Sequence, residues 1–265
     1  MARRGILATP RIELVSSPAM KQLGIIGFGS FGSFMAAHLR PFFEIVVFDL
    51  RDLRSAAEEA GVEWGSFETV VAVDALILAV PVQDMEDVLE RVVGCPTLPT
   101  IAIDVASVKV RPLELMKKWL PESVEILGTH PMFGPQSGRD GIRGLKVVVC
   151  PHRTTRLDRV RSLLEKDLGL RVLEMRPEDH DAEMAYVQGL THWIAKALRE
   201  IKLPNLELST PAYRHLLAIE EILREDSDAL FRTIQAENPF AAEARRELVA
   251  RLREIEAEIE GGESS

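Results

Sequence analysis

Cysteine is nearly absent from this chain of 265 residues. Only Cys95 and Cys150 occur, and neither belongs to a paired or metal-ligand spacing such as C-x-x-C. Such sparse use of cysteine favours a reducing, cytoplasmic compartment and gives no reason to expect a disulfide framework or a metal site.

Long apolar runs and an excess of positive charge are also missing. The longest apolar run, Ala75 to Val82, has the length of a strand, whereas a bilayer span needs roughly 18 to 20 apolar residues. The 41 acidic side chains outnumber the 32 basic ones and give a net charge of −9, which repels a phosphate backbone. No dense Lys/Arg stripe interleaved with aromatic residues occurs either. We therefore expect a protein that binds neither membrane nor nucleic acid.

Hydrophobic residues make up 46% of the chain, enough for a substantial core in one or two domains. Residues 1–19 carry several arginines but no apolar segment of the kind that a signal peptide needs. Met20 stands directly before the first expected strand. Residues 1–19 are therefore expected to be a disordered N-terminal extension, or the product of an upstream start codon.

Short runs rich in Val and Ile alternate with helical windows in the first part of the chain. This alternation predicts an α/β fold with a doubly wound, Rossmann-type parallel sheet over residues 20–174. From Pro177 onward four windows of helical periodicity follow, which predicts an all-helical region over residues 175–265. The expected strands are residues 23–27, 45–49, 75–80, 101–105, 125–127 and 145–150.

A G-x-G-x-x-G motif follows the first expected strand and opens a helix. In such motifs the glycines permit a tight turn and a close approach to a pyrophosphate, which the helix N-terminus then attracts. Asp49 ends the second strand, 22 residues after Gly27, where an acid that binds the adenosine ribose is expected. The alternative is a glycine-rich turn with an incidental surface aspartate. The motif consists of Gly27, Phe28, Gly29, Ser30, Phe31 and Gly32.

The choice between NAD and NADP depends on the residues around Asp49. Its carboxylate should repel the 2′-phosphate of NADP, whereas Arg51 and Arg54 lie close enough in sequence to attract it. We favour NAD and keep NADP open. Val80 and Pro81 end the third strand, where they either pack on the cofactor or simply mark a strand stopped by proline.

Three further segments carry a family resemblance. They are D-V-A-S-V-K at residues 104–109, G-T-H-P-M-F-G-P-Q-S-G at residues 128–138, and Q-G-L-T-H at residues 188–192. Together they resemble the plant-type branch of the prephenate/arogenate dehydrogenase family, from about residue 20 to about residue 246. The G-T-H-P-M-F-G-P segment is the specific part, since many dehydrogenases share the glycine motif.

The resemblance implies an oxidative decarboxylation on the way to tyrosine. His130 would take the proton of a ring hydroxyl while hydride leaves the same carbon for the nicotinamide and CO2 leaves the opposite ring position. By the same analogy Ser107 would hold the hydroxyl and the imidazole, and Lys109 would place the anionic substrate or the loop. Gln136 and Ser137 would line the substrate site. Without the surrounding motif, His130 would be a histidine that caps a Gly/Pro-rich turn.

His192 falls in a helix expected from about residue 178 to residue 201. Gln188 and His192 are four residues apart and share a face with Thr191, so we expect substrate contacts there. A buried structural histidine is the alternative for His192. The remaining histidines are interpreted as structural or solvated: His38, His152, His180 and His215.

The chain departs from the family pattern in two places. Gln136 stands where relatives often have Glu. The helical region also lacks the usual arginine that binds the substrate's side-chain carboxylate, and Arg214 is the one candidate to replace it. Asp226 is the acid that we expect near the substrate side chain, which favours arogenate, although Asp226 also fits a helix N-cap. Apolar residues in the last helices favour a homodimer.

Two other functions fit parts of the pattern. A β-hydroxyacid-type dehydrogenase also joins a dinucleotide domain to a helical one, but the G-T-H-P-M-F-G-P segment disfavours it. A non-catalytic nicotinamide sensor would need the glycine motif but not Ser107, His130 and His192.

Overall fold

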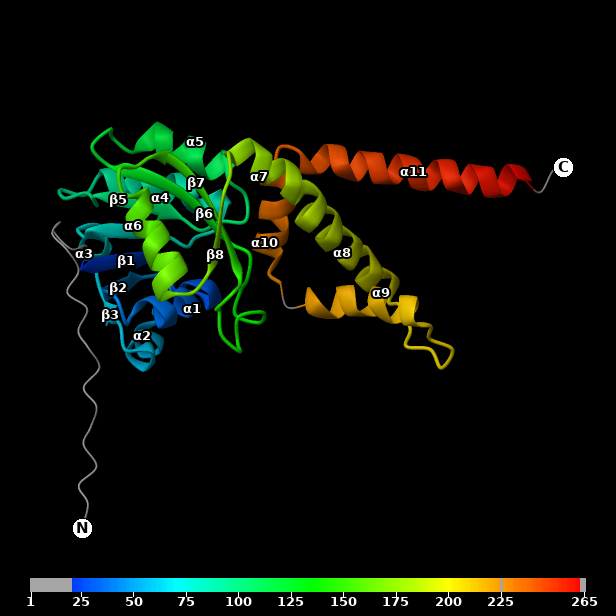
Figure 1. The fold of residues 1–265 in the computed structure, drawn as a ribbon, viewed down its shortest axis with the longest axis horizontal. Coiled ribbons are helices and arrows are strands. Elements are labelled where there is room, and N and C mark those ends of the chain that lie inside the picture. Colours follow the sequence, from blue (N-terminus) through cyan, green and yellow to red (C-terminus); the bar gives the residue numbers. More distant parts are fainter. Residues whose placement is uncertain (1–20, 225, 263–265) are drawn as a thin grey trace, which may run out of the picture.

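The computed structural model describes residues 21–224 and 226–262, so the extension expected over residues 1–19 lies outside the described part of the chain. An eight-stranded sheet forms the body of the molecule (Figure 1), in the order β3-β2-β1-β4-β5-β6-β7-β8. The strands are β1 (Gln22–Ile26), β2 (Glu44–Phe48), β3 (Glu63–Trp64), β4 (Ala75–Leu78), β5 (Ile101–Asp104), β6 (Glu125–Pro131), β7 (Lys146–Arg153) and β8 (Arg171–Glu174).

The sheet is the Rossmann-type sheet that the sequence predicts, except that it also contains the short edge strands β3 and β8 and that one strand pair is antiparallel. All strand pairs are parallel except β6 with β7, which run antiparallel. No helix separates these two strands: the chain turns back through the loop at residues 132–145, which contains the expected Gly/Pro-rich segment. The direct return therefore forces the antiparallel pairing that the prediction of a parallel sheet missed.

Helices cover both faces of the sheet. Apolar side chains of α3 (Phe67–Val71), α4 (Met85–Val93) and α5 (Val110–Trp119) pack on one face. Those of α1 (Ser30–Leu39), α2 (Arg54–Ala60) and α6 (Leu157–Ser162) pack on the other face. Two short turns complete this part, the 3₁₀ turn η1 (Val82–Asp84) and the π-helical turn η2 (Leu163–Asp167). The carboxyl ends of the parallel strands are thereby left as the edge where a ligand crevice belongs.

The helical region begins at Pro177, whose ring is tolerated in the first turn of a helix. The predicted long helix is continuous through α7 (Pro177–Met184), the π-helical turn η3 (Ala185–Leu190) and α8 (Thr191–Ile201), and Lys202 ends it in the left-handed conformation. The other elements are α9 (Pro211–Ile222), α10 (Asp228–Arg232), the π-helical turn η4 (Thr233–Glu237) and α11 (Ala241–Gly262).

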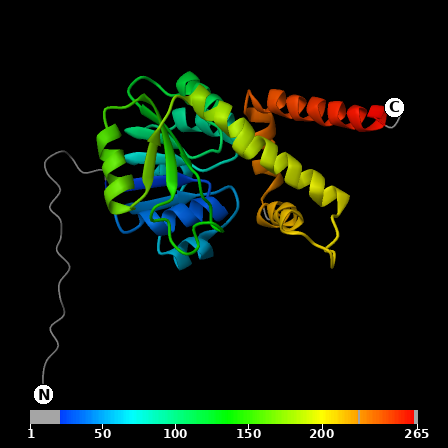
Figure 2. The ribbon, with the colours of Figure 1, turned by 45° about the vertical axis from the view of Figure 1, so that its right-hand side comes forward.

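The helical region leaves the body as two arms. The hairpin of α8 and α9 and the single helix α11 diverge from one another and extend away from the sheet (Figures 1 and 2). Within residues 21–224 and 226–262, none of the helices is both long and apolar enough to cross a membrane.

Candidate active site

The predicted dinucleotide motif forms a tight loop between β1 and α1. Gly27 has φ +97°, and its amide donates to the Phe48 carbonyl at 2.8 Å. A Cβ at Gly32 would lie 1.9 Å from the Gly27 carbonyl oxygen, so only glycine fits there. Gly29 precedes α1 with no side-chain cap, which leaves the first amides of the helix available to an anion.

Asp49 lies directly beside this loop. Its Oδ2 accepts from the Phe28 amide at 2.9 Å, and Arg51 donates to Asp49 Oδ1 through Nε at 2.9 Å. Partial burial acts to raise the pKa of the Asp49 carboxyl, but hydrogen bonds from Arg51 and Phe28 outweigh it and hold that pKa below its ordinary value. The expected acid and the expected basic reader of a 2′-phosphate therefore form one ion pair, while Arg54 faces Asp52 at 3.7 Å.

The residues present fit a dinucleotide. A Cβ at Gly27 would lie 2.3 Å from the Ala79 carbonyl oxygen and 3.2 Å from a Val80 methyl, so the chain preceding Pro81 borders the glycine loop. The loop, the uncapped start of α1 and the Asp49 carboxylate would hold the pyrophosphate and the ribose. When bound, a nicotinamide cofactor supplies the hydride acceptor.

Ser107 and His130 lie at the same edge of the sheet, where the strands β5 and β6 end. Asp104 of β5 pairs with Gly128 of β6, so the segments that follow these two residues run side by side. His130 lies within β6 itself and is only 3% exposed, whereas Ser107 is half-buried in the loop after β5. The alternative for His130 as a turn-capping histidine is wrong, because β6 continues through this residue.

The Lys109 side chain does not lie where the sequence analysis expects it. Its side chain is fully buried, and Nζ donates to the Asp104 carboxylate and, at 2.5 Å, to the Thr129 carbonyl oxygen. Burial raises the pKa of the Asp104 carboxyl, while the nearby Lys109 ammonium acts against that rise. An ammonium held in this way ties the ends of β5 and β6 together. The expectation of direct substrate contact by Lys109 is therefore wrong, and its expected role in placing the loop matches the contacts.

His180 lies against His130, which the interpretation as a structural or solvated side chain missed. Nδ1 of His130 lies 2.9 Å from Nε2 of His180, and Nδ1 of His180 lies 2.7 Å from Asp181 Oδ1. Fifty residues separate the two imidazoles, and a pattern within one helix could not reveal such a long-range contact. Burial, with smaller contributions from His180 and Lys109, holds the pKa of His130 well below its ordinary value. His130 is therefore a neutral imidazole near pH 7.

The other residues that we expect to contact the substrate lie on the long helix formed by α7, η3 and α8. The Gln188 Oε1 atom is buried and has no hydrogen-bond partner among the described residues. A buried acceptor without a donor is costly, and a ligand can supply that donor. The Thr191 hydroxyl instead donates to the Val187 carbonyl at 2.7 Å, within its own helix. Gln188 is thus the more suitable of the two for substrate contact.

His192 faces Asp226. Their Nδ1 and Oδ2 atoms are 3.5 Å apart, and the His192 side chain is 9% exposed. Burial lowers the pKa of His192 and raises that of Asp226, and each group acts on the other against this shift. The alternative of Asp226 as an N-cap is wrong, because Ser227 Oγ accepts from the Leu230 amide at 3.1 Å and caps α10.

Gln136 and Ser137 lie in the exposed loop between β6 and β7. Ser137 Oγ accepts from the Gly134 amide at 3.0 Å and shapes this turn. Gly138 packs against α1, since a Cβ there would come within 2.6 Å of Phe34. The loop thus lies over the helix that begins at the glycine motif.

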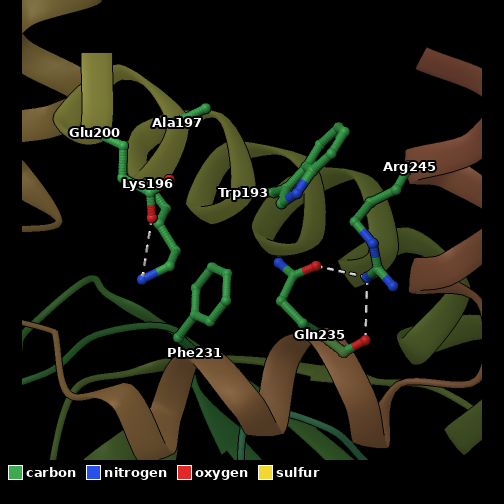
Figure 3. Close-up of a pocket in the computed structure, with 7 residues that line it drawn as sticks. All are labelled: Trp193, Lys196, Ala197, Glu200, Phe231, Gln235 and Arg245. Carbon is green, nitrogen blue, oxygen red and sulfur yellow. Dashed lines mark hydrogen bonds and ion pairs between the residues drawn. The ribbon is translucent and has the colours of Figure 1, made fainter. Parts of the chain in front are cut away.

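A separate hollow lies outside this constellation (Figure 3). It has a volume of about 360 Å³ and lies between α8, the α10–η4 segment and α11. Arg245 Nη1 donates to the backbone and side-chain oxygens of Gln235 at 3.0 and 2.6 Å, and the Lys196 ammonium lies 5.1 Å from the centroid of the Phe231 ring. None of the predicted site residues lines it; the lining is Trp193, Lys196, Ala197, Glu200, Phe231, Gln235 and Arg245.

Comparisons with known proteins agree on one family. The model of the prephenate dehydrogenase nucleotide-binding domain matches residues 41–173. Arogenate dehydrogenase 1, chloroplastic, from Arabidopsis thaliana is 32% identical over 248 residues, which cover 86% of this chain and 38% of that protein. Arogenate dehydrogenase 2, chloroplastic, from the same plant is 30% identical over 262 residues, with 94% and 72% covered. The chain therefore spans well under half of the first relative and about three quarters of the second.

Solved structures show the same fold. A prephenate dehydrogenase from A. aeolicus, in complex with hydroxyphenyl propionate and NAD+, superposes with a TM-score of 0.72 at 23% identity, covering 94% of both chains. An arogenate dehydrogenase from Synechocystis gives a TM-score of 0.68 at 21% identity, covering 92% of this chain and 93% of the other. At these identities the likeness establishes the architecture alone.

Proposed function

The chain belongs to the prephenate dehydrogenase family, and on this premise we propose that it oxidatively decarboxylates arogenate or prephenate in the last redox step toward tyrosine. The observation that carries the proposal is a buried, neutral His130 at the same sheet edge as an uncapped glycine loop. We place the reaction in the cytoplasm, since both cysteines are free thiols.

His130 acts as the general base. It takes the proton of the ring hydroxyl as the hydride leaves the same carbon, and the bond from the opposite ring carbon to its carboxylate breaks to release CO2. The electron pair of that bond completes the aromatic ring, and the ring oxygen regains a proton to give the phenol. A neutral imidazole is required, and burial of His130 keeps it neutral. The half-buried Ser107 hydroxyl orients the substrate hydroxyl beside it.

We assign NAD as the preferred cofactor. The Asp49 carboxylate stays ionised because Arg51 and the Phe28 amide donate to it. An ionised carboxylate accepts hydrogen bonds from the ribose hydroxyls and repels a 2′-phosphate. Arg51 is already engaged by Asp49, which weakens its attraction for NADP.

We assign arogenate as the preferred substrate. Arogenate carries a side-chain ammonium where prephenate carries a keto group, so an acid near this position distinguishes the two. Asp226 is half-buried and pairs with His192 on the long helix, one turn from the unpaired Gln188 Oε1. His192 and Asp226 contact the substrate side chain, while Gln188 accepts from one of its donors.

A second copy of the chain completes the helical region as a homodimer. Exposed Leu252, Ile255 and Ile259 lie at spacings of three and four residues, on one side of the projecting α11 (Figure 1). The α8–α9 arm also exposes Ile201 and Ile222. Side chains of both arms, such as Ala197 of α8 and Arg245 of α11, line the hollow described above, and the equivalent arm of a second copy covers it.

Steady-state turnover of arogenate and prephenate, each with NAD and NADP, tests the proposed activity. We expect NAD-dependent turnover that is faster with arogenate. A panel of β-hydroxyacids serves as the control, since a dehydrogenase of that class would turn over the panel instead. Binding of NAD without turnover of any of these compounds would identify a nicotinamide sensor.

A further inference from the structure

We propose that His180 and Asp181 are positioning residues that keep the proton of His130 on Nδ1 and leave Nε2 as the basic nitrogen. The inference rests on the proposed role of His130 as the general base. It adds two residues to the site that neither the motifs nor the comparisons identify.

The chain of contacts starts at Asp181. Its Oδ1 accepts from the Lys109 amide at 2.7 Å and its Oδ2 accepts from the Val110 amide at 2.9 Å, so both carboxylate oxygens act as acceptors. Oδ1 also lies 2.7 Å from Nδ1 of His180. A carboxylate that already accepts from backbone amides requires a donor at that nitrogen, and the proton of the neutral His180 ring is therefore on Nδ1.

The position of the proton on His180 fixes the position of the proton on His130. Once its proton is on Nδ1, a neutral His180 presents Nε2 as an acceptor, 2.9 Å from Nδ1 of His130. His130 must donate through Nδ1, so its own Nε2 carries a lone pair. Within residues 21–224 and 226–262, no side chain or backbone group hydrogen-bonds to that atom. The free lone pair is what a base needs in order to take a hydroxyl proton.

Burial makes this arrangement specific. His130, His180 and Asp181 are 3%, 1% and 0% exposed. A neutral imidazole in water exchanges readily between its two tautomers, whereas a buried pair with the wrong tautomer would place two N–H groups or two lone pairs against each other. Such a mismatch leaves buried polar groups unsatisfied, which is costly.

The unit also joins the two parts of the fold. His180 and Asp181 belong to α7, His130 belongs to β6, and the two amides belong to the start of α5. The Asn238 side chain donates to the Asp181 backbone carbonyl at 2.8 Å and fixes this turn of α7 from the other side. The His130 tautomer therefore depends on the contacts of the His180 and Asp181 side chains, whereas Asn238 contacts only the backbone of α7.

Asp181→Asn tests the inference because it reverses the direction of donation. With its NH2 group in the place of Oδ1, the asparagine donates to His180 Nδ1, and its oxygen still accepts from the Val110 amide. His180 then carries its proton on Nε2 and donates to His130, whose proton moves to the reacting nitrogen. We expect kcat to fall by about 10² to 10⁴, with KM and the Kd for NAD unchanged.

Two-bond ¹H–¹⁵N correlations on histidine-labelled protein read the tautomer directly, with His130→Ala identifying the signal. We expect an Nδ1–H tautomer in the wild type and an Nε2–H tautomer in Asp181→Asn. Because this spectrum needs no substrate, it distinguishes failure of the inference from failure of the proposed reaction. An Nε2–H tautomer in the wild-type protein, or no change in Asp181→Asn, would overturn the inference.

Three further variants separate positioning from folding. Asn238→Ala removes a buried hydrogen bond to the same turn, so it should lower Tm while the His130 tautomer stays Nδ1–H. His180→Asn keeps an acceptor for His130 Nδ1 and should retain at least about tenfold more kcat than His180→Leu, which has none. Equal losses in the two His180 variants would mean that His180 only fills space.

Discussion

Oδ2 of Asp226 lies 3.5 Å from Nδ1 of His192, joining the loop before α10 to the long helix. The contact is independent of helix capping, because Ser227 caps α10. The Asp226 carboxylate is therefore not used as a helix cap, which leaves it available for the substrate contact that we propose.

Asp226→Asn should lower kcat/KM for arogenate by about one to two decades and raise it for prephenate. The reason is loss of a partly desolvated carboxylate–ammonium hydrogen bond of about 1.5 to 3 kcal/mol. Kinetics with both substrates measure the effect. Ser227→Ala is the matched control: it should cost about 1 kcal/mol of stability and leave the substrate ratio alone. If both activities of Asp226→Asn fall together with Tm, Asp226 has a structural role.

Asp49→Ser should shift cofactor preference from NAD toward NADP. The change removes the carboxylate that repels a 2′-phosphate and releases Arg51 to bind it. The ratio of kcat/KM for the two cofactors is the measurement. Glu59→Gln is the control, since it removes an exposed charge elsewhere on α2 and should leave the ratio unchanged. A wild-type enzyme that already prefers NADP would contradict the assignment.

The acid limb of kcat should lie below pH 6.5, the ordinary pKa of histidine. Burial, His180 and Lys109 lower the pKa of His130, so the neutral base persists as pH falls and is lost only at that lowered pKa. The same shift stabilises the fold above pH 6.5 relative to lower pH, where the unfolded chain binds the extra proton. A pH profile of kcat tests this, and an acid limb at or above neutrality would contradict it.

Ile255→Glu should convert a dimer into monomers, because it places a charge in the apolar stripe of α11. Light scattering coupled to size-exclusion chromatography gives the mass. Glu258→Gln changes a charge elsewhere on the same exposed helix and should leave the dimer intact. A monomeric wild-type protein at micromolar concentration would contradict the proposal that a second copy covers the apolar side of α11.

Local signals in the sequence predict the glycine loop, the acid after β2 and the buried strands, because each depends on neighbouring residues. The two edge strands are not predicted, because neither forms an apolar run. Strand β3 has only two residues, and β8 has the sequence RVLE and is only partly buried. The motifs point to His130 and Ser107, whereas the contacts of Lys109 and His180 depend on partners elsewhere in the chain. For His180, the partner in β6 lies 50 residues away.

His130→Ala tests the central claim most directly, with kcat measured in saturating arogenate and NAD, and NAD affinity measured separately. We expect kcat to fall by about 10² to 10⁴, or about 3 to 5 kcal/mol, while the Kd for NAD stays unchanged. His38→Ala, which removes an imidazole packed on Phe34 in the same sheet domain, should keep wild-type kcat. A near-normal kcat in His130→Ala would contradict the assignment of His130 as the base.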